Sequence, residues 1–315
     1  MAEVMEIAPL LGAIFVLLTV GSGAAVVLAR RAKTAQARIT VANLRSRVNA
    51  WWGMVAVMVG ALALGRGALV CLFGLLSFLA LRELITLVPS RRADHRGLIA
   101  AFFLAIPVQY ALLWCGWYGL FAIFLPVYGF FALSVRVALS GDTERFLHRV
   151  AAIQYAVMIG VYCLSHAPAL LMLRIPGYEG QEWKLLLFLV GVVQISDVLQ
   201  YVWGKTLGRH KIVPLLSPSK TVEGFVGGVL SASAMGAALW WLTPFTPLVA
   251  FALALEITLA GFCGGLVMSA IKRDAGVKDY GNLLPGHGGI LDRVDSLAFA
   301  SPLMFHTVRW FWSTA

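Results

Sequence analysis

The chain has 315 residues, of which 60% are hydrophobic and 13% are charged. Soluble domains carry roughly 25% charged residues, so this composition excludes an ordinary soluble globular protein. A formal net charge of +10 would indicate nucleic-acid binding in a soluble chain. Here the positions of the basic residues explain the charge better, and we expect no nucleic-acid partner.

Apolar runs of 18 or more residues recur along the whole chain. Each is long enough to cross a hydrocarbon core of about 30 Å as a helix, which predicts an all-α, polytopic transmembrane helical bundle. The first run follows two acidic residues and precedes basic ones, the wrong polarity for a cleaved signal peptide. About ten helices are predicted, over residues 8–29, 48–65, 68–89, 97–115, 117–135, 150–173, 184–203, 222–242, 248–271 and 290–312.

The connections between these helices alternate in charge. Of the 25 Lys and Arg residues, 20 fall on one side, in residues 30–47, 90–96, 136–149, 204–221 and 272–293. The positive-inside rule makes that side cytoplasmic and places both termini outside. The other side has only Arg66, Arg174, Lys184 and Arg309.

We therefore expect one integral membrane domain over residues 1–315, in a multi-pass protein of the bacterial inner (cytoplasmic) membrane. Residues 1–183 form its N-terminal helices and give little functional signal. The polar loops concentrate in residues 184–315, which we predict to be the catalytic region.

The first polar loop follows the seventh predicted helix. Gln194, Asp197 and Tyr201 are spaced at i, i+3 and i+7, which predicts one polar stripe at the end of that helix. A carboxylate near hydrocarbon is costly, so Asp197 is expected to face the bundle interior beside a cation or a metal. An interfacial pair with Lys205 or Arg209 is the alternative.

The same loop continues as "SPSKTVEG", where Thr221 is predicted to cap the eighth helix, with Glu223 in its first turn. The N-H groups of the helix start, Ser217 and Lys220 together form a candidate anion site. The alternative is an ordinary capped helix with a snorkelling lysine.

The second polar loop, "SAIKRDAGVKDYGNLLPGHGGILDRVDS", spans residues 269–296. Gly288 and Gly289 allow close approach of backbone to a ligand, and Asp292 and Asp295 share a helix face at i, i+3. Carboxylates bind Mg²⁺ and basic groups bind phosphate oxygens, so the loop predicts phosphoryl or nucleotidyl transfer with a polyphosphate ligand. Its other candidate residues are Lys272, Arg273, Lys278, Asp279, His287 and Arg293.

This loop closely resembles the signature of the CDP-diacylglycerol synthases, or phosphatidate cytidylyltransferases: S, two residues, KR, four residues, KD, then PGHGG, two residues, DR, one residue, D. Asp197 with Tyr201, "WGKTLG" and "SPSKTVEGFVGG" resemble a second block of that family. The resemblance covers about residues 190–300.

The resemblance implies transfer of cytidylyl from CTP to phosphatidic acid with Mg²⁺, giving CDP-diacylglycerol and pyrophosphate. It implies CTP, phosphatidic acid and membrane lipids as partners, and it leaves the oligomeric state open, a homodimer included. The implied catalytic residues are Lys272, Arg273, Lys278, Asp279, His287, Asp292, Arg293 and Asp295; the implied substrate-binding residues are Asp197, Lys205, Ser217, Lys220, Thr221, Gly288 and Gly289; the implied metal ligands are Asp292 and Asp279.

One segment departs from the family pattern. Many members carry "GDLxES" before the KR pair, whereas this chain reads "GGLVMS", with Gly265 in place of the Asp and Met268 in place of the Glu. Gly261, Gly265 and Ser269 instead form a small-residue ridge that predicts close helix packing. The missing acid keeps open a divergent or inactive homologue that binds an anionic lipid.

A membrane transporter is the other alternative. Glu83, Glu256 and Asp197 would then be intramembrane ionisable residues along a path. Such a path predicts polar residues through to the outer side, whereas the polar residues here gather on the cytoplasmic side.

Overall fold

The computed structural model describes residues 2–31, 34–88, 90–283 and 288–314, and it confirms the all-α, polytopic architecture. In these residues the helical segments other than the short η6 join into ten continuous stretches, and eight are long and apolar enough to cross a membrane. The other two are α11, which is shorter, and α13, which starts within the second polar loop.

The bounds of the segments are α1 (Ala2–Arg31), α2 (Ala35–Leu64), α3 (Arg66–Leu87), η1 (Arg92–Asp94), α4 (His95–Ala100), η2 (Ala101–Ala105), α5 (Ile106–Trp114), α6 (Tyr118–Ile123), η3 (Phe124–Gly129), α7 (Phe130–Ala138), α8 (Phe146–Val157), η4 (Met158–Cys163), α9 (Leu164–Ala169), η5 (Leu170–Met172), α10 (Glu182–Thr206), α11 (Val222–Ala238), η6 (Trp240–Leu242), α12 (Pro247–Asp274) and α13 (Leu291–Trp312). Of the η segments, η2, η3 and η4 are π-helical and the others are 3-10.

The second helix begins at Ala35, so the prediction that it starts at residue 48 is wrong. Thr34 caps it, because its Oγ1 accepts a hydrogen bond of 3.2 Å from the N-H of Ala37. Alanine and arginine favour helix strongly, and arginine at a membrane surface does not interrupt one. The basic residues of this segment therefore lie mostly on a helix rather than in a loop.

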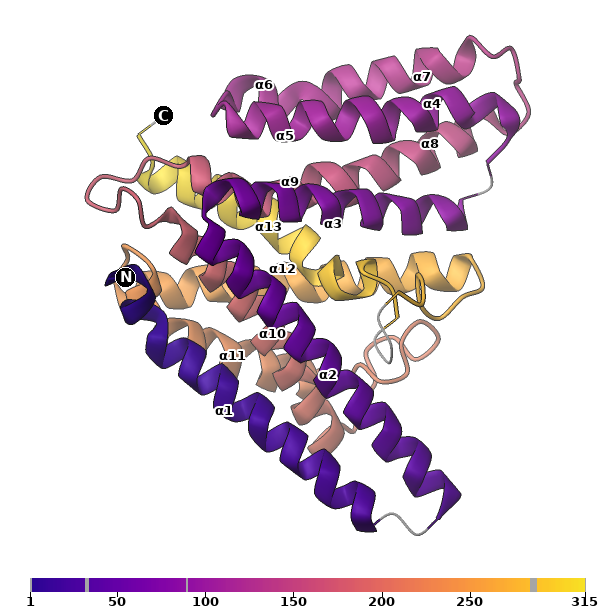
Figure 1. Cartoon of the computed structure of the whole chain (residues 1–315). Coiled ribbons are helices and arrows are strands. Elements are labelled where there is room, and N and C mark those ends of the chain that lie inside the picture. Colours follow the sequence, from indigo (N-terminus) through magenta and orange to yellow (C-terminus); the bar gives the residue numbers. More distant parts are fainter. Residues whose placement is uncertain (1, 32–33, 89, 284–287, 315) are drawn as a thin grey trace.

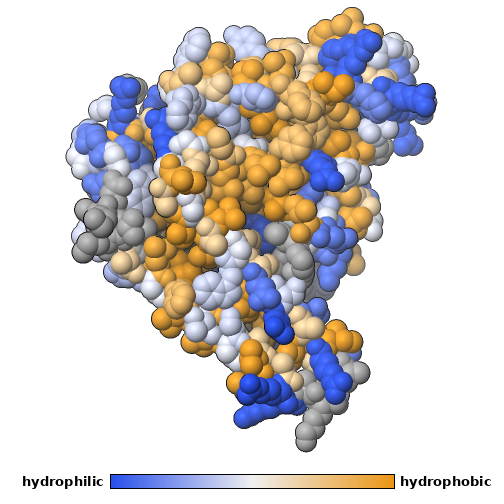
Figure 2. Space-filling view, viewed as in Figure 1, coloured by the Kyte–Doolittle hydropathy of each residue, from blue (hydrophilic) through white to orange (hydrophobic). Residues whose placement is uncertain are grey.

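Four of the five connections that the sequence assigns to the basic side lie at one end of the bundle. In Figure 1 the α3–α4, α7–α8, α10–α11 and α12–α13 connections are at the right, whereas both termini are at the left. Apolar side chains cover the middle of the visible face, and hydrophilic ones lie at its right, its bottom and its upper left (Figure 2). This arrangement agrees with the sidedness expected from the charge pattern.

Glycines bring the C-terminal helices α10 to α13 into close contact. A Cβ atom added to Gly228 of α11 would come within 2.3 Å of Gln200 Cγ in α10, and one on Gly264 of α12 within 2.7 Å of Phe299 in α13. A Cβ atom on Gly261 of the predicted ridge would lie 3.4 Å from Ser296 Cβ of α13. The four helices therefore pack with their backbones close together, and this fixes the relative positions of the two polar loops.

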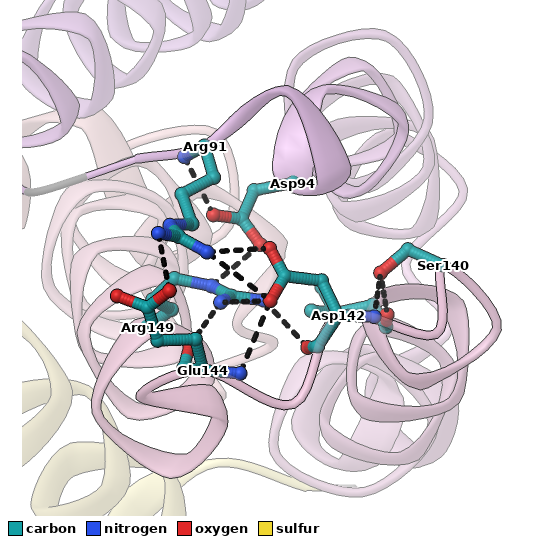
Figure 3. Close-up of polar contacts among 7 residues, drawn as sticks. Arg91, Asp94, Ser140, Asp142, Glu144 and Arg149 are labelled. Atoms are coloured by element: carbon teal, nitrogen blue, oxygen red, sulfur yellow. Dashed lines mark hydrogen bonds and ion pairs between the residues drawn. The ribbon is translucent and has the colours of Figure 1, made fainter.

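A separate polar network joins other helices at the basic end of the bundle (Figure 3). Arg149 of α8 is buried and donates from Nε to Asp94 Oδ1 at 3.1 Å. Arg91 pairs with Asp142 at 3.1 Å and with Glu144 at 2.5 Å. The network connects the start of α4, the α7–α8 connection and the start of α8, so its role in the fold is structural.

Candidate active site

The centre of the second polar loop is the carboxylate of Asp292, which is buried in the first turn of α13. Its Oδ1 accepts from Lys272 Nζ at 2.7 Å, in an ion pair that joins α12 to α13. Its Oδ2 accepts from the N-H of Tyr280 at 2.8 Å and of Gly289 at 2.9 Å. Asp292 therefore fixes the second polar loop to the start of α13 at Tyr280 and Gly289, and it joins this site to the end of α12 through Lys272.

Gly288 separates Asp292 from Asp279. It has a φ of 82°, and a Cβ atom there would lie 2.7 Å from Asp292 Oδ2 and 3.2 Å from Asp279 Cβ. Only glycine adopts this backbone conformation readily and leaves that space free. Asp292 and Asp279 are the candidate carboxylates for Mg²⁺, which takes one or two carboxylates in addition to phosphate oxygens.

A further carboxylate, from α3, holds the start of α13. Glu83 accepts from the N-H of Ile290 at 2.9 Å with Oε1 and from that of Leu291 at 2.8 Å with Oε2. A Cβ atom on Gly289 would lie 2.3 Å from Glu83 Oε2, so glycine is required for this contact. Glu83 acts as a capping carboxylate supplied by a distant helix.

Arg273 links the two polar loops. Its Nε donates to the carbonyl of Leu216 in the first loop at 3.3 Å, and its Nη1 donates to the carbonyl of Val277 in the second loop at 2.9 Å. Ser217 directly follows Leu216, so the contact with Arg273 places Ser217 close to the second loop. The structure thus brings both predicted motif loops together at one end of the bundle.

Lys220 of the first loop reaches α12 next to the residue that departs from the family pattern. Its Nζ lies 4.7 Å from the ring centroid of Phe262, a cation-π contact, and would be only 2.8 Å from a Cβ atom on Gly265. Burial lowers the pKa of the Lys220 ammonium, while Asp295 and Asp197 act in the opposite direction. The space beside Gly265 is therefore filled by a cation.

The first loop is folded by the residues at the start of α11. Thr221 Oγ1 accepts from the N-H of Gly224 at 3.1 Å, which confirms the predicted cap. Glu223 accepts from the N-H groups of Arg209 at 3.0 Å and of His210 at 3.2 Å. These contacts set the course of the loop that carries Lys220.

Asp197 meets α13 at the same end of the bundle. Its Oδ1 accepts from Ser296 Oγ at 3.2 Å, which joins α10 to α13. In the described residues no ion pair joins Asp197 to Lys205 or to Arg209, so the alternative of an interfacial pair is not seen. Tyr201 is 64% exposed, so it does not share a buried polar stripe with Asp197.

The other predicted site residues lie around this centre or outside it. Lys278 and Lys205 are exposed at the same end of the bundle, and no contact of their side chains with the site is found in the described residues. Arg293 has a buried Nε without a hydrogen-bond partner in the described residues, and its carbonyl accepts from Gln194 at 3.5 Å. His287 lies outside the described residues.

Known proteins match this chain over far more than the two polar loops. Residues 45–311 match the cytidylyltransferase family. This chain belongs to the cytidylyltransferase family. The family match extends the resemblance seen from the loops alone, at residues 190–300, back into the N-terminal helices.

Individual relatives of this cytidylyltransferase support the assignment. The chain is 33% identical to the phosphatidate cytidylyltransferase of Staphylococcus aureus (strain COL) over 264 residues, which cover 82% of this chain and 97% of the relative. It is 34% identical to the enzyme of the same name from Staphylococcus saprophyticus over the same length. It is 43% identical to the uncharacterized protein YnbB of Escherichia coli (strain K12) over 267 residues, 84% of this chain and 87% of YnbB.

The sequence did not indicate the role of Glu83 in this cytidylyltransferase. Glu83 is 207 positions from Ile290, so no local pattern connects the two. The available signal was an acid near the end of a span on the side of the motif loops, but pairing with Arg82 or snorkelling explained it equally well. Glu256, unexplained by sequence, accepts from Thr307 Oγ1 at 2.7 Å between α12 and α13.

Proposed function

We propose that this cytidylyltransferase transfers the cytidylyl group of CTP to phosphatidic acid, giving CDP-diacylglycerol and pyrophosphate. The observation that carries the proposal is the contact of Arg273 with both polar loops, which gathers Lys272, Arg273 and Lys220 at one end of the bundle. Clustered cations are suited to a polyphosphate, and the helices of the bundle give access to a lipid.

In this reaction the phosphate monoester of phosphatidic acid attacks the α-phosphorus of CTP. A P-O bond forms there, and the bond from the α-phosphorus to the oxygen bridging to the β-phosphate breaks, so that pyrophosphate leaves with the electron pair. The monoester is largely dianionic at neutral pH, because its second pKa is about 6. The attacking oxygen therefore needs no strong general base, and His287 has an orienting role.

The basic residues supply binding and orientation. Lys272, Arg273, Lys278 and Lys220 contact phosphate oxygens and oppose their mutual repulsion, which positions the two substrates in line. Ser217 and Thr221 belong to the first polar loop, which we expect to contact the nucleotide or its phosphates.

Asp292 and Asp279 would hold Mg²⁺. The ion, when bound, supplies neutralisation of the charge that develops on the phosphates. Asp292 also accepts from Lys272, so the same carboxylate fixes the position of that ammonium. We place the protein in the bacterial inner membrane with this end of the bundle toward the cytosol, where CTP is available.

A weak or inactive homologue that binds an anionic lipid is the second candidate. Gly265 favours it, because no side chain from this position can serve as a ligand, and the Lys220 ammonium fills the adjacent space. Purified protein with labelled CTP, phosphatidic acid and Mg²⁺ distinguishes the two. Formation of labelled CDP-diacylglycerol supports the enzyme; binding of phosphatidic acid without product supports the homologue.

A further inference from the structure

A cavity of about 840 Å³ lies at the end of the bundle opposite to the candidate active site. It is bounded by α1, α2, the start of α3 and the end of α13, together with the connections near them. Helix α13 has 22 residues, with Asp292 in its first turn and Arg309 in its last. At 1.5 Å per residue the helix is about 33 Å long, so the cavity and the site are on opposite sides of the membrane.

This cavity collects most of the positive charge on its side of the membrane. Arg66, Arg174, Lys184 and Arg309 are the four basic residues of that side in the sequence, and the three arginines line the cavity. Positive charge is depleted on outer segments by the positive-inside rule. Three arginines around one cavity are therefore not explained by topology.

The described lining of the cavity carries more positive than negative charge, with three arginines and one acid, Glu182. Within the described ranges no ion pair joins any of the three to an acid. The Oε1 of Glu182 accepts from the N-H of Gly180 at 3.1 Å, a hydrogen bond that leaves the negative charge of this acid in place beside the three arginines. Arg66 donates to the carbonyl of Trp114 at 3.2 Å, and the Arg309 guanidinium stacks 3.5 Å from the centre of the Tyr118 ring. These neutral contacts orient the guanidinium groups and leave their charge available to an anion.

The opposite wall of the cavity is apolar and belongs to the two least buried spans. Leu11 of α1, with Val59 and Leu62 of α2, contributes to it. Because α1 and α2 contact few other helices, they face the hydrocarbon of the bilayer. A ligand of this cavity therefore has an anionic part for the arginines and an apolar part for α1 and α2.

We propose that this cavity binds an anionic phospholipid of the outer leaflet, with its phosphate at Arg66, Arg174 and Arg309 and its acyl chains along α1 and α2. Arginine matches phosphate oxygens in a bidentate geometry, and the cavity has the size of a lipid headgroup with the first part of its chains. This cavity is separate from the proposed cytidylyl-transfer site. A lipid bound in it is therefore not positioned to react with CTP.

Native mass spectrometry of the full chain, released from neutral detergent, tests this inference. Three probes are titrated separately: phosphatidylglycerol, phosphatidylcholine with the same acyl chains, and inorganic phosphate. The double variant Arg66→Gln/Arg309→Gln removes two guanidinium groups, and Arg66→Lys/Arg309→Lys keeps both charges. Arg136→Gln, in α7, is the matched control for loss of a basic residue elsewhere.

We expect phosphatidylglycerol to bind the wild type at least tenfold more tightly than phosphatidylcholine, because both lipids carry the phosphate but the arginines repel the choline cation of phosphatidylcholine. The glutamine variant loses that preference; the lysine variant and Arg136→Gln retain most of it. Equal binding of both lipids, or an unchanged preference in the glutamine variant, overturns the proposal. Displacement of phosphatidylglycerol by an equal concentration of inorganic phosphate overturns the assignment to a lipid. The readout is binding alone, so it does not depend on turnover.

Discussion

Glu83 provides the sharpest test of how the active site is positioned. It comes from α3, far from both motif loops in sequence, and its carboxylate accepts the N-H groups of Ile290 and Leu291 at 2.9 and 2.8 Å. Replacement by alanine leaves two partly buried donors at the start of α13 without an acceptor. Each hydrogen bond to a charged group contributes about 1.5–3 kcal/mol, so the loss at the helix start is about 3–6 kcal/mol.

Loss of the Glu83 hydrogen bonds is expected to lower catalysis because it displaces Gly289 and, with it, Asp292. The N-H of Gly289 donates to Asp292, and Asp292 in turn holds Lys272. A displacement of about 1 Å in such a constellation costs roughly 100-fold in rate. We expect Glu83→Ala to lower cytidylyl transfer by about that factor, and Glu83→Gln, which keeps one neutral acceptor, by less.

The assay is CDP-diacylglycerol formation by purified variants, with Arg82→Gln as the matched control because Arg82 is the exposed neighbour of Glu83 on the same helix. Hydrogen exchange supplies a second readout, in which the amides of Ile290 and Leu291 exchange faster in Glu83→Ala. Wild-type turnover and unchanged exchange in Glu83→Ala would refute the positioning role.

The remaining predictions concern the centre of the site, the departure from the family pattern and the polar network. Asp292→Asn should abolish turnover in a protein that still inserts, and it should raise the Mg²⁺ concentration needed by any residual activity; an unchanged Mg²⁺ dependence would leave Asp292 only its loop contacts. A Cβ at position 265 lies 2.8 Å from Lys220 Nζ, so Gly265→Ala and Gly265→Asp should both lower activity by displacing the ammonium; a gain in rate with Asp alone would instead identify a missing ligand. Arg149→Leu removes the cation from buried Asp94 and should destabilise the protein by about 3–5 kcal/mol in mixed-micelle unfolding, whereas the exposed Arg96→Gln should not.

The features that local patterns encode were predictable from the sequence. Apolar runs predicted the helices, because a span needs about 20 apolar residues whatever its neighbours are. The cap at Thr221 was predictable because its partner, Gly224, lies three residues away. The start of the second helix was not, since arginines at a membrane surface fit a loop and a helix equally well.

Contacts between distant segments were beyond the reach of these patterns. The helix spacing placed Asp292 and Asp295 on one face, but the partners of Asp292 come from α12 and from loop backbone. Lys220 was a phosphate-binding candidate, and its position against Gly265 depends on how α11 packs on α12. Such side-chain environments arise from the tertiary packing of the four C-terminal helices.

The proposed cytidylyl transfer is tested most directly by incubating CTP and phosphatidic acid with the purified full chain and Mg²⁺, beside a standard phosphatidate cytidylyltransferase as control. We expect labelled CDP-diacylglycerol and an equal amount of pyrophosphate. Absence of CDP-lipid, under conditions in which the control enzyme works, would contradict the proposed transfer.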